Sequence, residues 1–372
     1  MTSLAFQVDQ VLSAVPGGTG TYVRRLVPAL AAADPDLSIA LFHARFAGAV
    51  PERWMRGFWT EELPLGIRRL YPSWNLLGRP PLPPSLAGRD LLHAPTAVTV
   101  PPRGVRQRLV VTVHDLAFVV HPEAFPREWR LLYRLGLHRA VRTADAVIAV
   151  SRHTGEDLIR RTRLDPSKLR VIPLAPSLPE TRADVEEALE RLKVRTPYVL
   201  FVGTLEPRKN LVRLVRAYRR VVRQGAPHAL VLAGPIGWHA QPLLRHVEAG
   251  GPGEVVLTGR VAAADLDALY RGASAFVYPS LYEGFGLPVL DAMARGLPSV
   301  VSTSSSLPEV AGEAAVPVDP FSEAGIADAL ARVLGDAGLA ARLREAGHAR
   351  ARAFSWERTA AETLEVYRSL LG

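Results

Sequence analysis

Short apolar segments bounded by turn residues recur along the chain and alternate with stretches of helical spacing. They have the length and continuous apolar character of strands that are buried on both faces. In the first half these segments are Leu4–Val8, Leu109–Val113 and Ala146–Val150. In the second half they are Tyr198–Val202, Ala229–Ala233, Val255–Leu257, Ala275–Tyr278 and Ser299–Val301. The repetition predicts an α/β protein with two parallel sheets, each covered by helices on both faces.

The chain has 372 residues, which at roughly 150 residues per domain favours two domains. We expect the first over residues 1–175 and the second over residues 176–353. Residues 354–372 should form a C-terminal helix that packs back toward the first domain. The best linker candidate is Leu174–Pro197, which starts with the Pro-rich LAPSLPE and continues through a charged, helical stretch over Arg182–Lys193.

Residues 51–84 do not follow the alternating pattern. They are rich in Pro, Trp and Arg and are interpreted as a long irregular loop. Trp54, Trp59 and Trp74 with their neighbouring arginines suit an acceptor or a membrane surface. Plain packing of an irregular subdomain explains the same composition equally well.

Composition indicates a globular protein, with 48% hydrophobic and 22% charged residues. The opening MTSLAFQVDQ lacks the basic and apolar regions of a secretory signal, and no apolar run approaches the length of a membrane span. We therefore expect a cytoplasmic protein. Because the chain has no cysteine, disulfides, thiolate catalysis and Cys-based zinc sites are excluded.

The formal net charge of +9 and the isoelectric point near 10.2 favour an acidic partner. Nucleic acid, anionic lipid and a phosphorylated small molecule all meet this description. Charge alone does not choose among them.

The segment YVLFVGTLEPRKN is typical of a buried strand followed by a turn and a helix that begins near Asn210, a competent N-cap. Arg208 and Lys209 thus precede a helix N-terminus, where exposed N–H groups and the helix dipole attract phosphate. Two cations oppose the local dipole, which indicates that an anion binds there. The alternative is two ordinary surface cations in a loop.

A second motif, FVYPSLYEGFGLPVLDAMARG, places Glu283 in a loop and Asp291 in the first turn of the following helix. Helical side chains tilt toward the N-terminus, so both carboxylates should face one opening, where they suit the vicinal diols of a sugar or ribose. Backbone N–H groups near Gly286 and Leu287 are candidates for holding phosphate. A tight turn and a dipole-compensating acid are the simpler alternatives.

A Gly-rich segment, Pro16–Tyr22, stands at the start of an apolar helix. Its glycines lack the dinucleotide spacing because Val23 occupies the position of the last glycine, so a nicotinamide dehydrogenase is disfavoured. A helix-capping turn explains Gly18 and Gly20 at least as well as a ligand site does.

His114 and Asp115 follow a predicted strand in LVVTVHDLAF. Open α/β sheets bind ligands beyond the carboxyl ends of their strands, which makes His114 a candidate site residue. A hydrogen-bonded core histidine is the alternative.

Taken in order, these segments resemble the family-four group of retaining glycosyltransferases, which have the two-domain GT-B fold. The resemblance rests on the acid, seven residues, acid spacing from Glu283 to Asp291. It rests also on GTLEPRKN, LVLAGPIGW, VVLTGRV, SSLPEVAGEAAVPVDP and FSWERTAAETLEVYRSLL. It covers nearly the whole chain and is densest from Tyr198 to Pro320.

The resemblance implies two Rossmann-like, doubly wound domains that face each other across a cleft. It implies that Arg208 and Lys209 bind the donor pyrophosphate, Glu283 the transferred sugar and Asp291 the ribose, with Arg260 and Val261 beside the base. The implied catalytic residues are His114, Glu283, Arg208 and Lys209. The implied donor-binding residues are Gly18, Gly20, Thr204, Val261, Phe285, Gly286, Leu287 and Asp291.

Two positions depart from the family pattern. Asp291 stands where glutamate is usual, and its side chain is one methylene shorter. Thr204 stands where many members have arginine, which shifts the phosphate contact to Arg208. The GTLEPRKN variant looks most like members that transfer mannose or rhamnose, so the expected donor is GDP-mannose and the expected pathway is polysaccharide biosynthesis.

With the family, we expect retention through front-face attack, in which the departing diphosphate helps to deprotonate the acceptor. No His pair stands at metal-ligand spacing, and we expect neither a metal nor another cofactor. The expected acceptor is a glycan or a lipid-linked sugar, reached by peripheral contact with the inner face of the cytoplasmic membrane. The alternative is a non-catalytic module that binds a sugar nucleotide or an anionic surface; nucleic acid is not expected.

Overall fold

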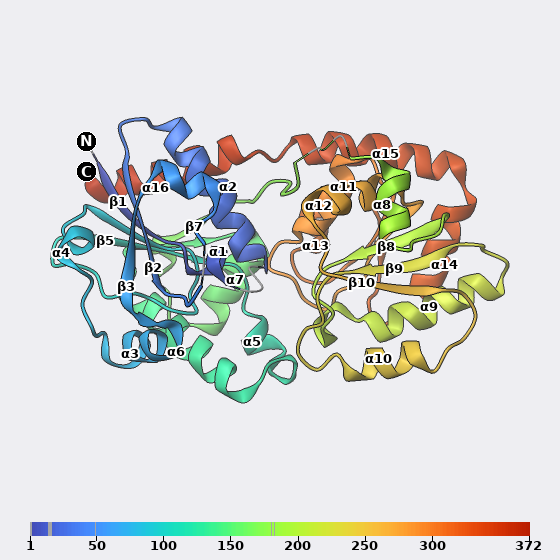
Figure 1. Cartoon of the computed structure of the whole chain (residues 1–372), viewed down its shortest axis with the longest axis horizontal. Coiled ribbons are helices and arrows are strands. Elements are labelled where there is room, and N and C mark those ends of the chain that lie inside the picture. The colour runs from blue at the N-terminus through green and yellow to red at the C-terminus, as the bar shows by residue number, and fades with distance from the viewer. Residues whose placement is uncertain (1, 14–16, 49, 180, 182) are drawn as a thin grey trace. The chain divides into compact units, whose positions relative to one another are not determined.

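The computed structural model describes residues 2–13, 17–48, 50–179, 181 and 183–372. Pro16 of the Gly-rich segment and Arg182 of the predicted linker helix lie outside these residues. The chain divides into two compact units. Unit 1 comprises Met1–Pro122, Pro126–Leu174 and Ser355–Gly372, and unit 2 comprises Glu123–Phe125 and Ala175–Phe354. Each unit has its own parallel sheet with flanking helices, which confirms the predicted α/β class (Figure 1).

Within the described residues, the sheet of unit 1 has seven strands in the order β3-β2-β1-β4-β5-β6-β7, all parallel. They are β1 (Ser3–Gln7), β2 (Ser38–Arg45), β3 (Trp59–Gly66), β4 (Leu91–Ala94), β5 (Arg108–Val113), β6 (Ala146–Ala149) and β7 (Leu169–Val171). The winding reverses between β1 and β4, as in a Rossmann-like domain.

Helices lie on both faces of this sheet. In Figure 1, α2 and α16 lie on one face, and α3 and α6 lie on the opposite face. The α-helices of unit 1 are α1 (Asp9–Leu12), α2 (Gly17–Ala33), α3 (Ile67–Leu77), α4 (Pro84–Ala87), α5 (Ala117–Val120), α6 (Arg127–Thr143), α7 (Arg152–Arg161) and α16 (Trp356–Leu371). Short 3-10 turns span Arg53–Gly57, Pro122–Ala124 and Pro166–Lys168.

The sheet of unit 2 has six parallel strands among the described residues, in the order β10-β9-β8-β11-β12-β13. They are β8 (Tyr198–Val202), β9 (Ala229–Ala233), β10 (Val255–Gly259), β11 (Ala275–Tyr278), β12 (Ser299–Ser302) and β13 (Val316–Val318). This is the strand order of unit 1 without its seventh strand. The winding here reverses between β8 and β11.

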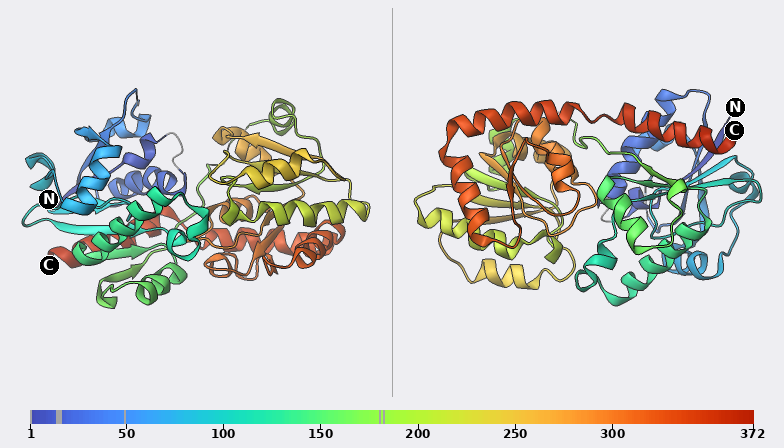
Figure 2. Two further views of the ribbon diagram at one scale, coloured as in Figure 1. Left: turned by 90° about the horizontal axis from the view of Figure 1, so that it is seen from below. Right: turned by 180° about the vertical axis from the view of Figure 1, so that it is seen from behind.

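The sheet of unit 2 is again covered on both faces, and Figure 2 shows it from two further sides. Its α-helices are α8 (Val185–Arg191), α9 (Leu211–Arg223), α10 (Gln241–Glu248), α11 (Ala263–Gly272), α12 (Leu287–Ala294), α13 (Leu307–Ala311), α14 (Glu323–Gly335) and α15 (Ala337–Arg352). A 3-10 turn spans Pro207–Lys209. Among the helices that the structure describes, none has both the length and the apolar character needed to cross a bilayer.

The prediction of an irregular loop over residues 51–84 is wrong. Strand β3 pairs in parallel with β2, and α3 buries Tyr71 and Trp74. Because β3 is the outermost strand, its faces are only partly covered and it lacks the continuous apolar run of a central strand. It also contains Pro64, which an edge strand tolerates. Such an edge strand therefore has no clear hydrophobic pattern in the sequence.

The C-terminal helix α16 is tied to the sheet of unit 1 by a buried polar network. The Tyr367 hydroxyl lies 2.5 Å from Nδ1 of His93 on β4, and Oγ1 of Thr112 on β5 lies 2.8 Å from Nε2 of the same ring. The Tyr22 hydroxyl on α2 lies 3.0 Å from Oγ1 of Thr112. These contacts join the last helix of the chain to three elements of unit 1.

Candidate functional site

The candidate site of unit 2 lies where its sheet reverses winding. Strands β8 and β11 are neighbours there, and the loops that follow them leave the same edge of the sheet. In open α/β sheets this is the place where ligands bind. Arg208 and Lys209 follow β8 and Glu283 follows β11, so the topology accounts for their meeting.

These three charged side chains are in direct contact. Nζ of Lys209 lies 2.5 Å from Oε1 of Glu283 and 2.9 Å from the Tyr278 hydroxyl. Nη1 of Arg208 donates to Oε2 of Glu283 at 2.9 Å, and its Nη2 donates to Oε1 of Glu206 at 2.7 Å. Each cation of the predicted phosphate site is therefore paired with a carboxylate of the protein itself. Glu206 and Tyr278 were missed, although GTLEPRKN displays the acid two positions before Arg208.

The cluster is buried, and its charges compensate one another. Burial alone would raise the pKa of Glu283, but Arg208 and Lys209 hold this pKa at about 2. Burial and the neighbouring Arg208 lower the pKa of Lys209, against the pull of Glu283. Because Lys209 and Glu283 are each 6% exposed, the site presents preorganised charge in a low-dielectric setting, where it acts strongly on a ligand.

Asn210 precedes α9 as predicted, but its side chain does not cap the helix. Its backbone is left-handed, with a φ of 62°, a conformation that asparagine adopts more readily than most residues. Its Nδ2 donates to the carbonyl oxygens of Pro279 at 3.0 Å and Pro320 at 2.7 Å. Asn210 therefore ties the loop after β8 to the loop after β11. A local sequence pattern does not reveal this nonlocal choice of partner.

Two serines hold the backbone of the Glu283 loop. Oγ of Ser305 accepts a hydrogen bond from the Glu283 N–H at 2.8 Å. Oγ of Ser306 donates to the carbonyl oxygens of Glu283 at 2.9 Å and Phe285 at 3.0 Å. Neither serine was predicted as a site residue, although both lie in the segment SSLPEVAGEAAVPVDP.

The start of α12 requires glycine at position 286. Gly286 has a φ of 109°, and a Cβ atom there would lie 2.7 Å from Cδ2 of Leu307. Phe285 and Leu287 are 5% and 8% exposed, so their side chains belong to the packing. What these residues offer a ligand is chiefly backbone.

Asp291 is the fifth residue of α12, one position beyond the predicted first turn. Its Oδ1 accepts from the N–H groups of Ser177 at 2.6 Å and Leu178 at 3.1 Å, and its Oδ2 accepts from the Ser177 hydroxyl at 2.5 Å. Burial raises the pKa of Asp291 and these hydrogen bonds oppose that rise. The carboxylate thus contacts the linker segment, whereas Glu283 contacts the two cations.

His114 follows β5 in unit 1, at the carboxyl edge of that sheet. Its Nε2 lies 2.9 Å from the carbonyl oxygen of Pro95, and burial lowers the pKa of the ring to about 4. The imidazole is therefore neutral near pH 7. Since a carbonyl only accepts, Nε2 carries the proton and Nδ1 is left as the acceptor of the ring.

The other candidate residues lie at a helix start or in loops that follow strands. Gly18 and Gly20 lie in the first turn of α2, so they are part of the helix and not of a loop before it. Thr204 is half-buried two residues after β8, and Val261 is half-buried two residues after β10. Gly18, Gly20 and His114 belong to unit 1, and the remaining site residues belong to unit 2.

The chain has two Asp-x-Asp runs, at Asp34–Asp36 and Asp265–Asp267, a pattern that can bind metal. Asp267 is instead ion-paired with Arg271 at 3.0 Å and Arg295 at 2.8 Å. Asp34 lies 3.1 Å from Arg368. Over the part of the chain that the structure describes, no group of three or more His, Asp or Glu side chains is arranged to hold a metal ion.

Comparison with known families gives two matches in tandem. Residues 184–350 match "Glycosyl transferases group 1", and residues 16–176 match "Glycosyltransferase Family 4". The first range lies within the second predicted domain, and the second range overlaps most of the first predicted domain.

Two Escherichia coli proteins are among the similar curated sequences. The chain is 34% identical to O-antigen chain mannosyltransferase B over 270 residues, which is 71% of each chain. It is 31% identical to the serotype-specific mannosyltransferase WbdA over 293 residues, which is 74% of this chain and 35% of WbdA. The chain thus spans about a third of WbdA.

Solved structures show the same fold over the full length. A sucrose-phosphate synthase from Thermosynechococcus elongatus superposes with a TM-score of 0.76 at 23% identity, over 100% of this chain and 99% of that one. Anabaena HepE, in complex with UDP and glucose, superposes with a TM-score of 0.74 at 19% identity, over 99% and 100% of the two chains. These similarities are to GT-B glycosyltransferases and confirm the predicted fold class.

Proposed function

Because the chain belongs to the group 1 glycosyltransferases of the GT-B fold, we propose that it moves a mannosyl group from GDP-mannose to a glycan or lipid-linked acceptor. The observation that carries the proposal is the buried contact of Arg208 and Lys209 with Glu283 at a strand-end switch point. The identity to two mannosyltransferases favours mannose as the transferred sugar.

In this proposal the donor exchanges partners with the cluster. The diphosphate takes hydrogen bonds from Arg208 and Lys209, which guanidinium and ammonium groups donate readily to phosphate. Glu283 then turns its acceptor lone pairs to the hydroxyl groups of the sugar. The backbone at Gly286 and Leu287 supports the diphosphate, and Asp291, Thr204 and Val261 contact the nucleoside side of the donor.

The chemistry follows from the charge that develops. When the bond from the anomeric carbon to the diphosphate breaks, negative charge grows on the leaving oxygen, and Arg208 and Lys209 stabilise it. The acceptor hydroxyl attacks on the same face and gives its proton to the leaving diphosphate, so configuration is retained. His114 is neutral and acts near the transferred sugar through a hydrogen bond. No metal or other cofactor takes part, and turnover should persist in saturating chelator.

We further propose that unit 1 binds the acceptor and works at the inner face of the cytoplasmic membrane. Trp59 is 49% exposed on β3, with the guanidinium of Arg89 5.9 Å from the centre of its ring. An amphipathic aromatic beside a cation suits the membrane interface. Trp74 is 1% exposed and belongs to the core, so this part of the proposal rests on Trp59.

A donor and acceptor panel tests the proposal. The purified protein is incubated with GDP-mannose and with UDP-, ADP- and dTDP-hexoses, with mannose-terminated glycans as acceptors, and products are identified by mass and anomeric configuration. We expect transfer from GDP-mannose with an α-linked product. Binding of the donor without transfer to any acceptor would point to the non-catalytic module, and transfer from another nucleotide sugar only would replace the donor assignment.

A further inference from the structure

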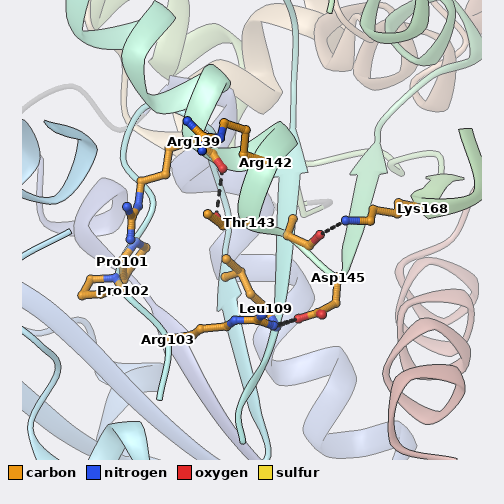
Figure 3. A pocket seen from close by; sticks show the side chains of 10 residues that line it. Pro101, Pro102, Arg103, Leu109, Arg139, Arg142, Thr143, Asp145 and Lys168 are labelled. Atoms are coloured by element: carbon orange, nitrogen blue, oxygen red, sulfur yellow. Dashed lines mark hydrogen bonds and ion pairs between the residues drawn. The ribbon is translucent and has the colours of Figure 1, made fainter. Parts of the chain in front are cut away.

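Unit 1 contains a pocket of about 320 Å³ at the edge of its sheet opposite to His114 (Figure 3). It opens where β5, β6 and β7 begin, whereas His114 follows the end of β5. The lining residues are Pro101, Pro102, Arg103, Leu109, Arg139, Arg142, Thr143, Ala144, Asp145 and Lys168. The pocket and His114 lie at opposite ends of β5, so the pocket is distinct from the candidate active site.

The pocket has an excess of positive charge. Arg103 comes from the loop before β5, Arg139 and Arg142 from the last turn and a half of α6, and Lys168 from the turn before β7. The one carboxylate, Asp145, is already engaged, since its Oδ2 accepts hydrogen bonds from Arg103 and from the Leu109 N–H. Arg139, Arg142 and Lys168 have no carboxylate within 4.0 Å among the described residues. The charges of these three cations therefore remain available to bind an anionic ligand.

A backbone carbonyl group fixes the orientation of the Arg139 guanidinium. Its Nε donates to the carbonyl oxygen of Val100 at 2.9 Å, which fixes the plane of the guanidinium. Burial lowers the pKa of Arg139, and no acidic neighbour raises it again. A half-buried cation without a counter-ion is costly, and an anion in the pocket would offset that cost.

Two backbone carbonyl groups near the end of α6 already have side-chain partners in the pocket wall. The carbonyl oxygen of Arg139 accepts from the Thr143 hydroxyl at 2.8 Å, and the carbonyl oxygen of Ala144 accepts from Nζ of Lys168 at 3.0 Å. These two carbonyl groups, which would otherwise repel an anion, are thus bonded within the pocket wall. Figure 3 shows the basic side chains around the space that remains.

We propose that this pocket is a second phosphate-binding site, which takes a phosphate ester or diphosphate group through Arg139, Arg142 and Lys168. Guanidinium groups match phosphate oxygens in geometry and charge. The pocket volume of about 320 Å³ exceeds that of a bare phosphate and admits an attached organic group. The site is independent of the donor-binding role proposed for Arg208 and Lys209.

The phosphate has two possible sources, a soluble compound and the headgroup of an acidic lipid. Val105 is fully exposed in the loop that carries Arg103, beside Arg106 and Arg108. An exposed apolar side chain among arginines is typical of a segment that touches a membrane surface. The test therefore has one arm for each source.

In the first arm, inorganic pyrophosphate is titrated into the Arg208→Ala protein, which weakens the donor site, and heat is measured by calorimetry. The titration is then repeated with Arg142→Ala introduced into the same background. Arg134→Ala is the matched control, because both arginines are exposed on α6 but only Arg142 lines the pocket. In the second arm the same α6 variants are sedimented with vesicles of phosphatidylglycerol or of phosphatidylcholine.

We expect Arg142→Ala to weaken binding about tenfold in at least one arm, and Arg134→Ala to change it less than about twofold. An effect on pyrophosphate alone identifies a soluble phosphate, and an effect on phosphatidylglycerol vesicles identifies a lipid headgroup. Equal losses in the two variants would show nonspecific charge attraction and overturn the proposal. Absence of any Arg142-dependent binding in both arms would overturn it as well.

Discussion

Nζ of Lys209 lies 2.5 Å from Oε1 of Glu283, although 74 residues separate the two along the chain. Both side chains are nearly buried, and Arg208 pairs with the other carboxylate oxygen. The contact joins the loops after β8 and β11, so it stabilises the fold at the place where a donor is proposed to bind. A donor diphosphate must compete with Glu283 for these cations.

The Glu283→Gln variant should lower the free energy of unfolding by about 3–5 kcal/mol, because it leaves the buried cation of Lys209 without its carboxylate and removes one of the two carboxylates that pair with the half-buried Arg208. Urea unfolding followed by circular dichroism measures the change. Glu187→Gln is the matched control, since Glu187 is exposed and pairs with Arg191 on the surface of α8; its effect should stay below about 0.5 kcal/mol. Equal stability of the two variants would contradict the structural importance of the pair.

The Arg208→Ala variant should reduce kcat/KM for the donor roughly tenfold to a hundredfold. This corresponds to the loss of a charged hydrogen bond of about 1.5–3 kcal/mol in the transition state. Initial rates over a range of donor concentrations measure it. Arg216→Ala, on the exposed face of α9, should keep the wild-type rate. A normal rate for the Arg208 variant would remove its assigned role in catalysis.

Substitutions at Asp291 and Ser177 distinguish a ribose contact from a purely structural one. Asp291→Asn and Ser177→Ala both weaken the tie between α12 and the linker, so both should destabilise unit 2 by about 1–3 kcal/mol. If Asp291 also holds ribose, Asp291→Asn should raise the donor KM about tenfold more than Ser177→Ala does. Parallel KM values in the two variants would leave Asp291 with the structural role alone.

Acid should destabilise unit 1 through two buried histidines. Burial lowers the pKa of His93 to about 3, with His114 contributing, and burial lowers the pKa of His114 to about 4; the ordinary value is 6.5. Below pH 6.5 the unfolded chain therefore binds protons that the folded chain does not. The contribution of the two neutral histidines to the free energy of unfolding is fully present above pH 6.5. It is lost as the pH falls toward 4 for His114 and toward 3 for His93.

Urea midpoints measured from pH 7.5 to pH 4.5 test this pH dependence, for which we expect a loss on the order of a few kcal/mol. Glu283 does not enter this range, because its pKa of about 2 and its ordinary value of 4.5 confine its effect to lower pH. His114→Asn should flatten the curve between pH 6.5 and pH 4.5. An unchanged slope in that variant would mean that His114 is protonated in the folded protein.

The two-sheet α/β architecture and the family could be predicted from local sequence patterns. The central strands are buried on both faces, so each appears as a continuous apolar run whatever its neighbours are. The motifs that carry Arg208, Lys209 and Glu283 also stand directly after such runs, and parallel strands bring their carboxyl ends to one edge. Local information was sufficient in each of these cases.

The partners of the buried polar groups, by contrast, depend on the folded chain. Asn210 bonds to Pro279 and Pro320 instead of capping α9, and Asp291 bonds to Ser177 in the linker segment. The edge strand β3 likewise acquires its identity from pairing with β2. The physical reason is that a buried polar group or an exposed edge takes whichever partner the folded chain brings within hydrogen-bond distance, and residues about a hundred positions apart leave no periodic trace of that choice.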